Sequence, residues 1–288
     1  MRHAYLIMAH HEPEILKLLL SRLDHSDNDF YVHLDRKSSM NTDEIASAVK
    51  QSNLVFIERK RISWGDYSQI DCEIRLLESA IQGNYDYYHL ITGVDLPLKS
   101  NEEIDQFFRQ NNGAEFISFD REANETGNFV RRYDGYHFNI CYFGNNALLK
   151  RASILANKLL KKVLRVVNRY VRRSKNYPEL VFMKGSSYFD ITHALACHVL
   201  SQKSLIEKVF KHTLCCDEVF LHTVAYNSPY REKITFSGTR FIDWSKHENS
   251  PQVLTMEHYG QLVQTEKLFA RKFSSAHSGE LIQKLYRS

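Results

Sequence analysis

The sequence predicts an α/β protein with a mostly parallel central sheet flanked by helices. Over the first 120 residues, short apolar segments alternate with longer segments whose apolar residues recur every three or four positions. This alternation implies parallel strands, because each helix returns the chain to the sheet in a right-handed crossover. The chain has 288 residues, of which 43% are hydrophobic and 25% charged, so it can bury a large core.

Five strands are expected in this first part of the chain, because each segment is a short apolar run bounded by polar residues. They span residues 3–10, 29–35, 53–58, 85–92 and 114–120. The first run, HAYLIMAH, is expected to be a strand and not a signal peptide, because no small-residue cleavage site follows it.

Four helices are expected between these strands. They span residues 13–23, 41–51, 66–82 and 101–111. Pro13 suits a first helical turn, where its missing N–H would have no partner within the helix. Asn41 or Thr42 can cap the second helix, with Glu44 in its first turn.

The second half of the chain is less regular. We expect a long loop over residues 121–147 and a basic helix over residues 148–175. A strand, a Gly-Ser turn and a helix should follow over residues 180–202, and a further helix over residues 217–227. The chain should end with a strand-like segment over residues 233–245 and a short helix with a basic tail over residues 255–273. We treat the chain as one continuous domain with two halves, residues 1–120 and 121–288.

The positive charge of the chain is concentrated in one segment. The formal net charge is +4, and residues 148–175 alone hold ten Lys or Arg and no acid, which leaves −6 for the remainder. A basic amphipathic helix is typical of membrane-surface or partner-binding segments, and a solvated basic face on a packed helix is the alternative. The acidic remainder argues against a broad nucleic-acid footprint.

The cysteines and the hydropathy indicate a compartment. The five cysteines are odd in number and form no C-x-x-C pair, which predicts reduced thiols in a cytoplasmic protein and argues against a zinc site. The sequence has no apolar run of about eighteen residues, so we expect no membrane span.

Polar side chains follow the predicted parallel strands. His10, Asp35, Trp64 and Asp95 each lie beyond the end of one strand, where open α/β sheets bind their ligands. A polar rim with a tryptophan suits a nucleotide or a sugar. The motifs G-x-G-x-x-G, G-x-x-x-x-G-K-[ST] and G-x-S-x-G are absent, which argues against a nicotinamide dehydrogenase, a P-loop enzyme and a serine hydrolase.

Two adjacent acids, Asp217 and Glu218, open the apolar segment DEVFLHTVAYN. An aspartate at a helix cap accepts a backbone N–H, and a glutamate in the first turn is favoured by the helix dipole. The two residues therefore have a purely structural interpretation, and a catalytic role for Glu218 is the alternative.

The motifs resemble the core-2/I-branching β-1,6-N-acetylglucosaminyltransferase family, which is related to the peptide O-xylosyltransferases. The resemblance extends over nearly the whole chain and suggests a bacterial-type member. Its segments, in order, are AYLIMAHHEPEILKLLLSRL, FYVHLDRKS, ISWGDYSQIDCEIRLLESA, YHLITGVDLPLKSNEEI, KGSSYFDITHALACHVL, DEVFLHTVAYNSPY, TRFIDW and LFARKF. The resemblance implies a fold of the GT-A type.

The resemblance also implies a reaction: inverting transfer of a sugar, GlcNAc or xylose above all, from a UDP-sugar to a hydroxyl, without a metal cofactor. Glu218 falls on the family's general base, with Asp217 as its helix-capping neighbour. Lys272 falls on the diphosphate-binding lysine, and Arg271 is expected to assist it. The family's second basic residue, an arginine upstream of this lysine, has no clear match.

Further site residues are implied by the resemblance. His10, Asp35, Trp64 and Asp95 would bind the donor, where Asp95 sits beneath the donor sugar or holds the turn before Pro97. Contacts with the acceptor are assigned to Arg131, Arg132 and Trp244. A solvated loop pair is the alternative for the two arginines, and a core position is the alternative for Trp244.

Several partners and alternatives remain open from the sequence. The acceptor is expected to be a glycan, a lipid-linked glycan or a glycoconjugate, and residues 148–175 are expected to contact the inner face of a membrane peripherally. Competing functions are a nucleic-acid- or membrane-binding protein that acts through the basic helix and a catalytically degenerate protein that only binds a sugar nucleotide.

Overall fold

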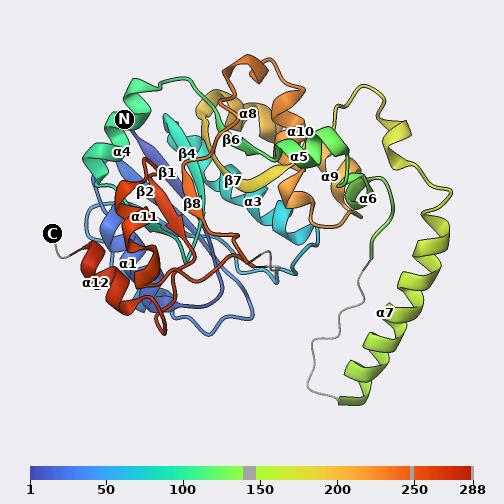
Figure 1. The fold of residues 1–288 in the computed structure, drawn as a ribbon, viewed down its shortest axis with the longest axis horizontal. Helices are drawn as coiled ribbons and strands as arrows, with labels where there is room; N and C mark the ends of the chain where they lie inside the picture. The colour runs from blue at the N-terminus through green and yellow to red at the C-terminus, as the bar shows by residue number, and fades with distance from the viewer. Residues whose placement is uncertain (139–146, 247–249, 287–288) are drawn as a thin grey trace.

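A six-stranded sheet forms the centre of the molecule (Figure 1). The computed structural model describes residues 1–138, 147–246 and 250–286. The strand order is β3-β2-β1-β4-β7-β6. Their bounds are β1 His3–Ala9, β2 Asn28–Leu34, β3 Leu54–Phe56, β4 Tyr87–Thr92, β6 Phe116–Phe119 and β7 Gly185–Thr192. The first four of these strands in spatial order pair in parallel, and β7 runs antiparallel to both β4 and β6, which confirms the predicted α/β class.

A small second sheet lies beside the first and is built from the end of the chain. Strand β9 (Phe269–Arg271) pairs antiparallel with β5 (Leu96–Pro97) and parallel with β8 (Arg240–Ile242). The predicted basic tail is therefore wrong, because the segment LFAR is apolar enough to become a buried strand. Residues 233–245 were expected to be strand-like, and only their middle forms a strand.

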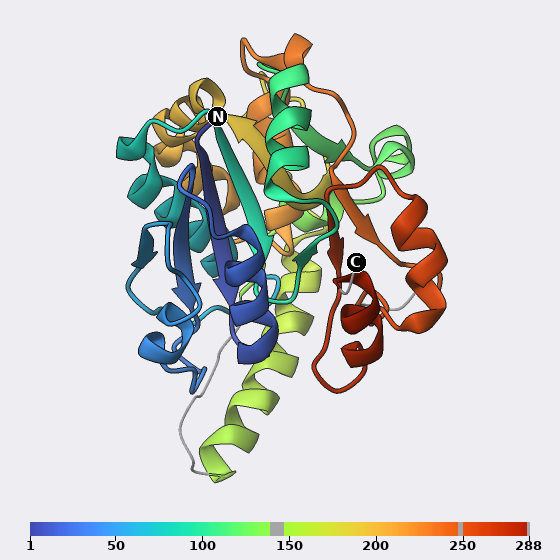
Figure 2. The ribbon, with the colours of Figure 1, turned by 90° about the vertical axis from the view of Figure 1, so that its left-hand side faces the viewer.

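Helices cover both faces of the large sheet (Figures 1 and 2). Adjacent residues of β1 alternate between two buried clusters: Ala4 and Leu6 pack on one face, and Tyr5 and Ile7 on the other. Helices whose apolar residues join the first cluster include α3 (Ser68–Ala80), α8 (His193–Ser201), α9 (Lys203–Phe210) and α10 (Phe220–Tyr226). Those of the second cluster are α1 (Pro13–Leu23), α2 (Thr42–Ala46), α4 (Asn101–Gln110), α11 (Tyr259–Gln264) and α12 (Gly279–Leu285).

The caps of two early helices follow their sequence signals. Asn41 caps α2, because its side chain accepts a hydrogen bond from the backbone N–H of Asp43. Ser100 and Glu103 form a reciprocal capping box at the start of α4. Both caps were accessible from the sequence because they depend only on neighbouring residues.

Three expectations for the second half are wrong. The long loop contains two short helices, α5 (Arg121–Thr126) and α6 (Val130–Tyr133), up to the point where residues 139–146 fall outside the described part. The basic helix, α7, is shorter than expected and spans Ala147–Val167. The Gly-Ser pair of residues 185–186 makes no turn, because it opens the central strand β7.

Gly185 is at this position because a side chain has no room there. A Cβ atom built on it would lie 1.8 Å from the carbonyl oxygen of Ser118 and 2.4 Å from Nε2 of His222. His222 is itself fully buried, and its Nε2 lies 3.0 Å from the Ser118 oxygen. The close approach of β6 to β7 therefore requires glycine.

We expect Gly185→Ala to lower the free energy of unfolding by about 2–3 kcal/mol, because the methyl group must displace backbone or a buried ring. Chemical denaturation measures the change. Gly260→Ala is the matched control: a Cβ there meets nothing within 4 Å, and alanine in a helix should be neutral or slightly stabilising. Equal stability of the two variants would contradict the close packing at Gly185.

Candidate active site

Glu218 lies in a tight turn whose charges surround its carboxylate. It ends a 3-10 turn, η3 (Cys216–Glu218), and Arg132 Nη1 lies 2.5 Å from its Oε2. Lys184 Nζ is 3.7 Å from the same oxygen and 2.8 Å from Asp120 Oδ2. The carboxylate remains about one third exposed, so a substrate can reach it.

Asp217 does not cap a helix, which corrects one expectation. Helix α10 begins at Phe220, its cap position is Val219, and no side chain caps it. The backbone takes a left-handed conformation at Cys215, with φ of 49°, and then makes the 3-10 turn, so Asp217 points elsewhere. Its Oδ2 accepts a hydrogen bond of 3.1 Å from Gln69 Nε2.

Gln69 ties the tryptophan loop to the turn that holds Glu218. Its Oε1 accepts a hydrogen bond of 2.5 Å from the backbone N–H of Gly65, while its Nε2 donates to Asp217. The carbonyl of Gly65 in turn accepts from Cys215 N at 2.9 Å. Trp64, 75% exposed, therefore lies on a loop that is fixed against the Glu218 turn.

Two further acids lie behind Glu218. Burial, followed by the charge of Glu218, raises the pKa of Asp217 to about 7. Glu73 on α3 is buried, its Oε2 has no hydrogen-bond partner among the described residues, and burial followed by the charge of Asp217 raises its pKa well above the usual range. Burial therefore favours the neutral form of Glu73, and near neutral pH Asp217 is divided between its two forms.

A second cluster lies where β5, β8 and β9 meet the large sheet. Asp95 is fully buried and accepts hydrogen bonds from the N–H and the hydroxyl of Thr92. It also faces two guanidinium groups, with Arg240 Nε at 4.0 Å and Arg271 Nη1 at 3.8 Å. Both guanidinium groups lie over the ring of Tyr188, at 5.2 and 4.8 Å from its centroid.

These guanidinium groups keep unused donors. Nε of Arg240, and Nε and Nη1 of Arg271, are buried and have no hydrogen-bond partner within the described structure. Burial lowers the pKa of Arg271 while Asp95 opposes the shift, yet a guanidinium stays charged in proteins. Buried donors without partners are costly, so this cluster suits an anionic ligand with several oxygens.

Strand β7 connects the two clusters. Side chains at alternate positions of a strand share one face, so Ser186 and Tyr188 follow one another along β7, and Lys184 immediately precedes the strand. Lys184 contacts Glu218, and Tyr188 contacts both arginines. At about 3.3 Å per residue, the two ends are separated by roughly 13 Å, a length that suits a sugar attached to a diphosphate.

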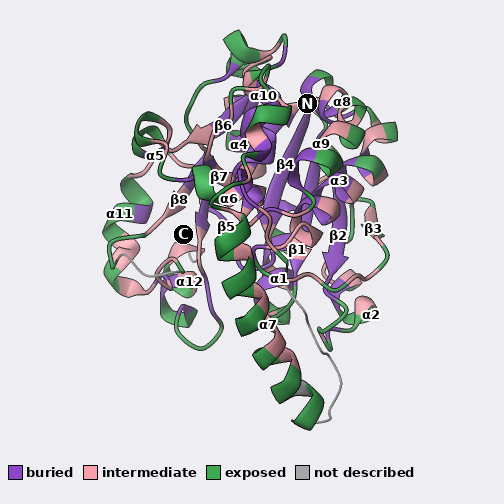
Figure 3. Cartoon of the chain, turned by 90° about the vertical axis from the view of Figure 1, so that its right-hand side faces the viewer, coloured by how far each residue is buried: buried purple, intermediate pink, exposed green. Residues whose placement is uncertain are grey.

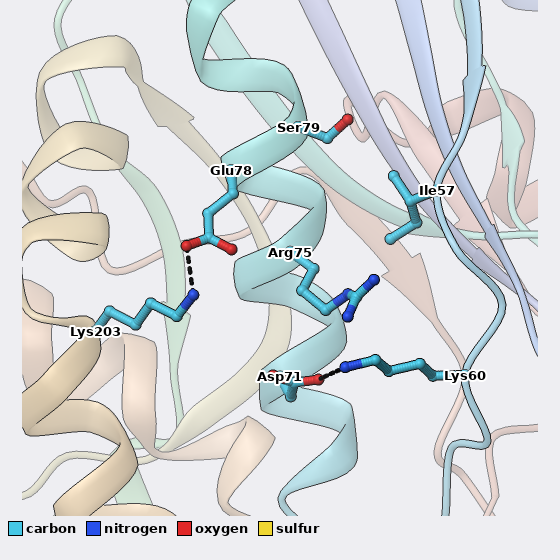
Figure 4. A pocket seen from close by; sticks show the side chains of 7 residues that line it. All are labelled: Ile57, Lys60, Asp71, Arg75, Glu78, Ser79 and Lys203. Atoms are coloured by element: carbon cyan, nitrogen blue, oxygen red, sulfur yellow. Dashed lines mark hydrogen bonds and ion pairs between the residues drawn. The ribbon is translucent and has the colours of Figure 1, made fainter.

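A cavity of about 210 Å³ opens along this face. Its lining residues are Ser118, Ser186, Tyr188, Gly238, Arg240, Ile242, Trp244 and Lys267. Trp244 is 49% exposed, so the alternative of a core position is wrong for it. A larger hollow of about 370 Å³ on the outer side of α3 contains none of the predicted site residues (Figure 4). Its charges pair with each other, as in Lys60–Asp71 and Lys203–Glu78.

His10 and Asp35 lie at the carboxyl ends of β1 and β2. Asp35 is buried and uses both carboxylate oxygens to accept backbone N–H groups of Lys37 and Ile62. Burial lowers the pKa of His10, and the charges of Lys272, Lys37 and Arg271 act in the same direction, against Asp35. The structure thus places these two residues in the same electrostatic neighbourhood as Arg271 and Lys272.

The paired arginines of α6 differ in their contacts. Arg132 bonds to Glu218, and this contact raises its pKa although burial opposes the shift. Arg131 is exposed, and its carbonyl oxygen accepts a hydrogen bond from His137 Nε2 when that nitrogen carries the proton. The predicted loop pair therefore divides into one residue at the Glu218 carboxylate and one on the surface.

Four residues of these clusters were not assigned from the sequence: Gln69, Lys184, Tyr188 and Arg240. Lys184 and Tyr188 were within reach, because they flank Ser186 with strand periodicity in KGSSYF. Arg240 and Gln69 act through partners 50 and 148 residues away in the chain, and no local pattern could have indicated those contacts.

Two searches concern ligands and membranes. Within the part of the chain that the structure describes, no group of three His, Cys, Asp or Glu side chains could hold a metal ion. Over the same residues, no helix combines the length and the apolar character that crossing a bilayer requires.

Comparison with known proteins identifies the class. Residues 3–264 match the family described as "Branch: Core-2/I-Branching enzyme", and the chain belongs to this family. Xylosyltransferase 2 of Canis lupus familiaris is 22% identical over 98% of this chain and 33% of that protein. Xylosyltransferase 1 of Rattus norvegicus is 19% identical over 99% of this chain and 35% of that protein. The chain spans about a third of the length of these curated relatives.

Solved structures give weaker likenesses. S. aureus TarS 1–349 in complex with UDP-GlcNAc shares 16% identity at a TM-score of 0.29, over 42% of this chain and 35% of that chain. The apo form of mouse xyloside xylosyltransferase 1 shares 10% identity at a TM-score of 0.41, over 93% of this chain and 97% of that chain. Scores this low do not bear on the site.

We expect Asp217→Asn to stabilise the protein at pH 8 and to change it little at pH 4. The folded state holds the Asp217 proton up to about pH 7, whereas an unfolded aspartate loses it near pH 4. Ionisation of this side chain therefore removes stability as the pH rises between those values. Asparagine cannot ionise and still offers an oxygen to Gln69.

Chemical denaturation at several pH values measures this difference, which should reach about 2–4 kcal/mol at pH 8. Asp43→Asn on the surface is unsuitable as a control because Asp43 lies in the first turn of α2. Asp27→Asn, on an exposed loop residue, is the matched control and should show no such pH dependence. A constant offset for Asp217→Asn at all pH values would contradict the shifted pKa.

Proposed function

We propose that this protein is an inverting, metal-independent glycosyltransferase of the GT-A type that uses a UDP-sugar donor. The observation that carries the proposal is the pairing of two clusters on one face of β7. One is a reachable carboxylate held by two cations, and the other is a buried pair of arginines with unused donors. The family membership is consistent with it.

The chemistry would be a single displacement at the anomeric carbon. The oxygen of the acceptor hydroxyl attacks this carbon while the bond to the diphosphate oxygen breaks and UDP leaves with the electron pair. Glu218 takes the hydroxyl proton as general base. Arg132 would orient the carboxylate, since it holds Oε2 in the free protein. An attack from the face opposite the leaving group inverts the configuration.

Positive charge would stabilise the leaving diphosphate. Arg271 and Lys272, together with the buried Arg240, offer fixed donors where negative charge develops, a task that a metal ion performs in other enzymes. We assign Arg240 as the second basic residue that the sequence left unmatched. Asp95 would hold the two arginines apart and face the donor sugar.

Other site residues complete the proposal. His10 and Asp35 would border the uridine, and Trp64 would cover the donor from its fixed loop. Trp244, which lines the cavity, would stack on the acceptor sugar, with Arg131 at the rim. The donor half would be residues 1–120 and the acceptor half residues 121–288, although β7 from the second half completes the first sheet.

The transferred sugar is proposed to be GlcNAc or xylose, and the acceptor a glycan, a lipid-linked glycan or a glycoconjugate. A bacterial type, a cytoplasmic location and the lack of a nucleic-acid partner stay predictions. The competing interpretation is a degenerate, non-catalytic protein that only binds a sugar nucleotide. The exposed carboxylate of Glu218 beside Arg132 favours catalysis over this interpretation.

Calorimetric titration with UDP, GDP, CMP and NAD in excess EDTA tests the donor. We expect UDP to bind without metal and the other nucleotides to bind weakly or not at all. If UDP binds only after manganese is restored, the metal-independent mechanism is wrong and Asp95 becomes a candidate ligand. The absence of any nucleotide binding would refute the transferase proposal itself.

Glu218→Gln separates binding from chemistry. UDP affinity should stay within about twofold of the wild type, while turnover of a UDP-GlcNAc or UDP-xylose donor falls by about 10²–10⁴, because only the proton acceptor is removed. Release of UDP measures turnover. A variant with normal turnover would exclude Glu218 as the base.

Arg271→Met should weaken UDP binding by about 10- to 100-fold, because a charge-assisted contact to the diphosphate is lost. Arg109→Met is the matched control. Arg109 is an exposed arginine that forms an ion pair with Asp105 on the same helix, and its loss should leave UDP affinity unchanged. Similar affinities for both variants would place the diphosphate elsewhere.

A further inference from the structure

Helix α7 carries a row of apolar side chains that face solvent. Leu155, Leu159, Val163 and Val166, here called the apolar stripe, recur at intervals of four, four and three residues and so share one side of the helix. Each is between 54% and 59% exposed. Single exposed leucines are common on protein surfaces, whereas a continuous row of them marks an interaction site.

A second row borders the first. Arg151, Lys158, Lys162 and Arg165, here called the basic stripe, are exposed and lie about a quarter of a turn around the helix from the apolar stripe. No acidic residue occurs between positions 148 and 175, so no side chain within the segment neutralises these charges. The remaining side, with Ala156, Leu160 and Leu164 among its residues, is half-buried.

The C-terminal end of α7 is anchored to the body. Asn168 follows the helix, and its side chain both donates to Tyr136 O and accepts from Tyr136 N, at 2.9 Å each. Arg173 is buried, and its guanidinium donates to the carbonyl of Val209 at 2.9 Å. From this anchored end the helix extends away from the sheet and its covering helices (Figures 1 and 3).

We propose that α7 docks the protein onto an anionic lipid bilayer. The apolar stripe enters the boundary between headgroups and acyl chains, and the basic stripe lies against the phosphates of the headgroups. The helix lies in the plane of the surface and does not cross it, in agreement with its many Lys and Arg residues. Tyr170, 84% exposed in the turn after the helix, supplies an interfacial aromatic ring.

Charge and shape favour this occupant over two others. A second copy of α7 would bring two basic stripes together with no acid to separate them. A nucleic acid would satisfy the basic stripe but leave the apolar stripe in water. A bilayer with anionic headgroups offers a complement to both stripes at once.

Docking would also fix the distance between the bilayer and Glu218. The anchoring residue Tyr136 lies just after α6, and α6 carries Arg132, which bonds to Glu218. This consequence rests on the proposed function, whereas the docking itself does not. The proposed lipid-linked acceptor would meet the site at a defined height above the membrane.

Flotation of the purified full chain with vesicles tests the docking. We expect binding to vesicles of phosphatidylcholine mixed with phosphatidylglycerol and little binding to phosphatidylcholine alone. Leu155→Glu with Leu159→Glu should reduce binding to the anionic vesicles at least tenfold. Lys158→Glu with Lys162→Glu should reduce it about fivefold for each basic residue removed.

Matched controls place the same changes elsewhere on the surface. Val263→Glu replaces a valine that is 50% exposed on α11, and Lys50→Glu with Lys208→Glu reverses two exposed lysines; neither should alter vesicle binding. Circular dichroism and thermal unfolding show whether each variant is folded, as expected for exposed positions.

Three outcomes would overturn the docking. The first is no binding to anionic vesicles, and the second is an equal loss of vesicle binding in the control variants. The third is light scattering that shows a dimer of the wild type which both stripe variants convert to monomers. Binding of a random-sequence duplex DNA that depends only on the basic stripe would replace the bilayer by a nucleic acid. UDP calorimetry on the stripe variants separates the docking proposal from the transferase proposal, because the UDP affinity of these variants should match that of the wild type. Vesicle binding without any UDP binding would leave the docking intact and refute only the transferase.

Discussion

The two sheets of this protein are joined through one buried aspartate. Asp190 on β7 accepts hydrogen bonds from Thr239 and from the guanidinium of Arg240 on β8, and it lies 2.9 Å from Nδ1 of His89 on β4. Burial alone would raise its pKa, but Arg240 and His89 outweigh burial and lower the pKa to about 2. Breaking such a pair leaves an uncompensated buried charge, which costs several kcal/mol, so the pair fixes where the small sheet lies.

The candidate anion site depends on this junction. Because Asp190 holds both Nη atoms of Arg240, the Nε atom is left facing Asp95 and Tyr188, with no hydrogen-bond partner in the described part of the chain. Strand β9 pairs with β8 and brings Arg271 to the other side of Asp95. A single buried carboxylate thus orients one arginine directly and a second one through a strand. The positions of these unused arginine N–H groups are therefore set by the packing of the two sheets and not by a flexible surface.

The sequence predicted the parts of the fold that depend on local pattern. The first four parallel strands and their helices followed from alternating hydrophobicity, and Asn41, one of the two predicted caps, caps its helix. The errors lie where distant contacts override local preference. The Gly185–Ser186 pair resembles a turn, yet the close approach of Ser118 and His222 requires glycine inside a strand.

The candidate site shows the same division. A resemblance in motif indicated Glu218, Arg271 and Lys272 because their neighbours in sequence are distinctive. It assigned Asp217 a capping role, because an acid before an apolar run usually caps a helix. The left-handed residue Cys215 redirects it, together with a hydrogen bond from Gln69, which lies on α3 148 residues away. Only a structure places the buried carboxyl group of Glu73, whose pKa burial raises, behind that pair.

The arrangement of charge around Glu218 explains why the acids behind it matter. Two cations, Arg132 and Lys184, lie 2.5 and 3.7 Å from one oxygen of this carboxylate and hold it in place. A second full negative charge at Asp217 would compete for the same cations, and burial raises the cost of that charge. Burial raises the pKa of both Asp217 and Glu73, which reduces the negative charge behind this turn. The carboxylate of Glu218 and its two cations therefore form the charged part of the turn that a substrate can reach.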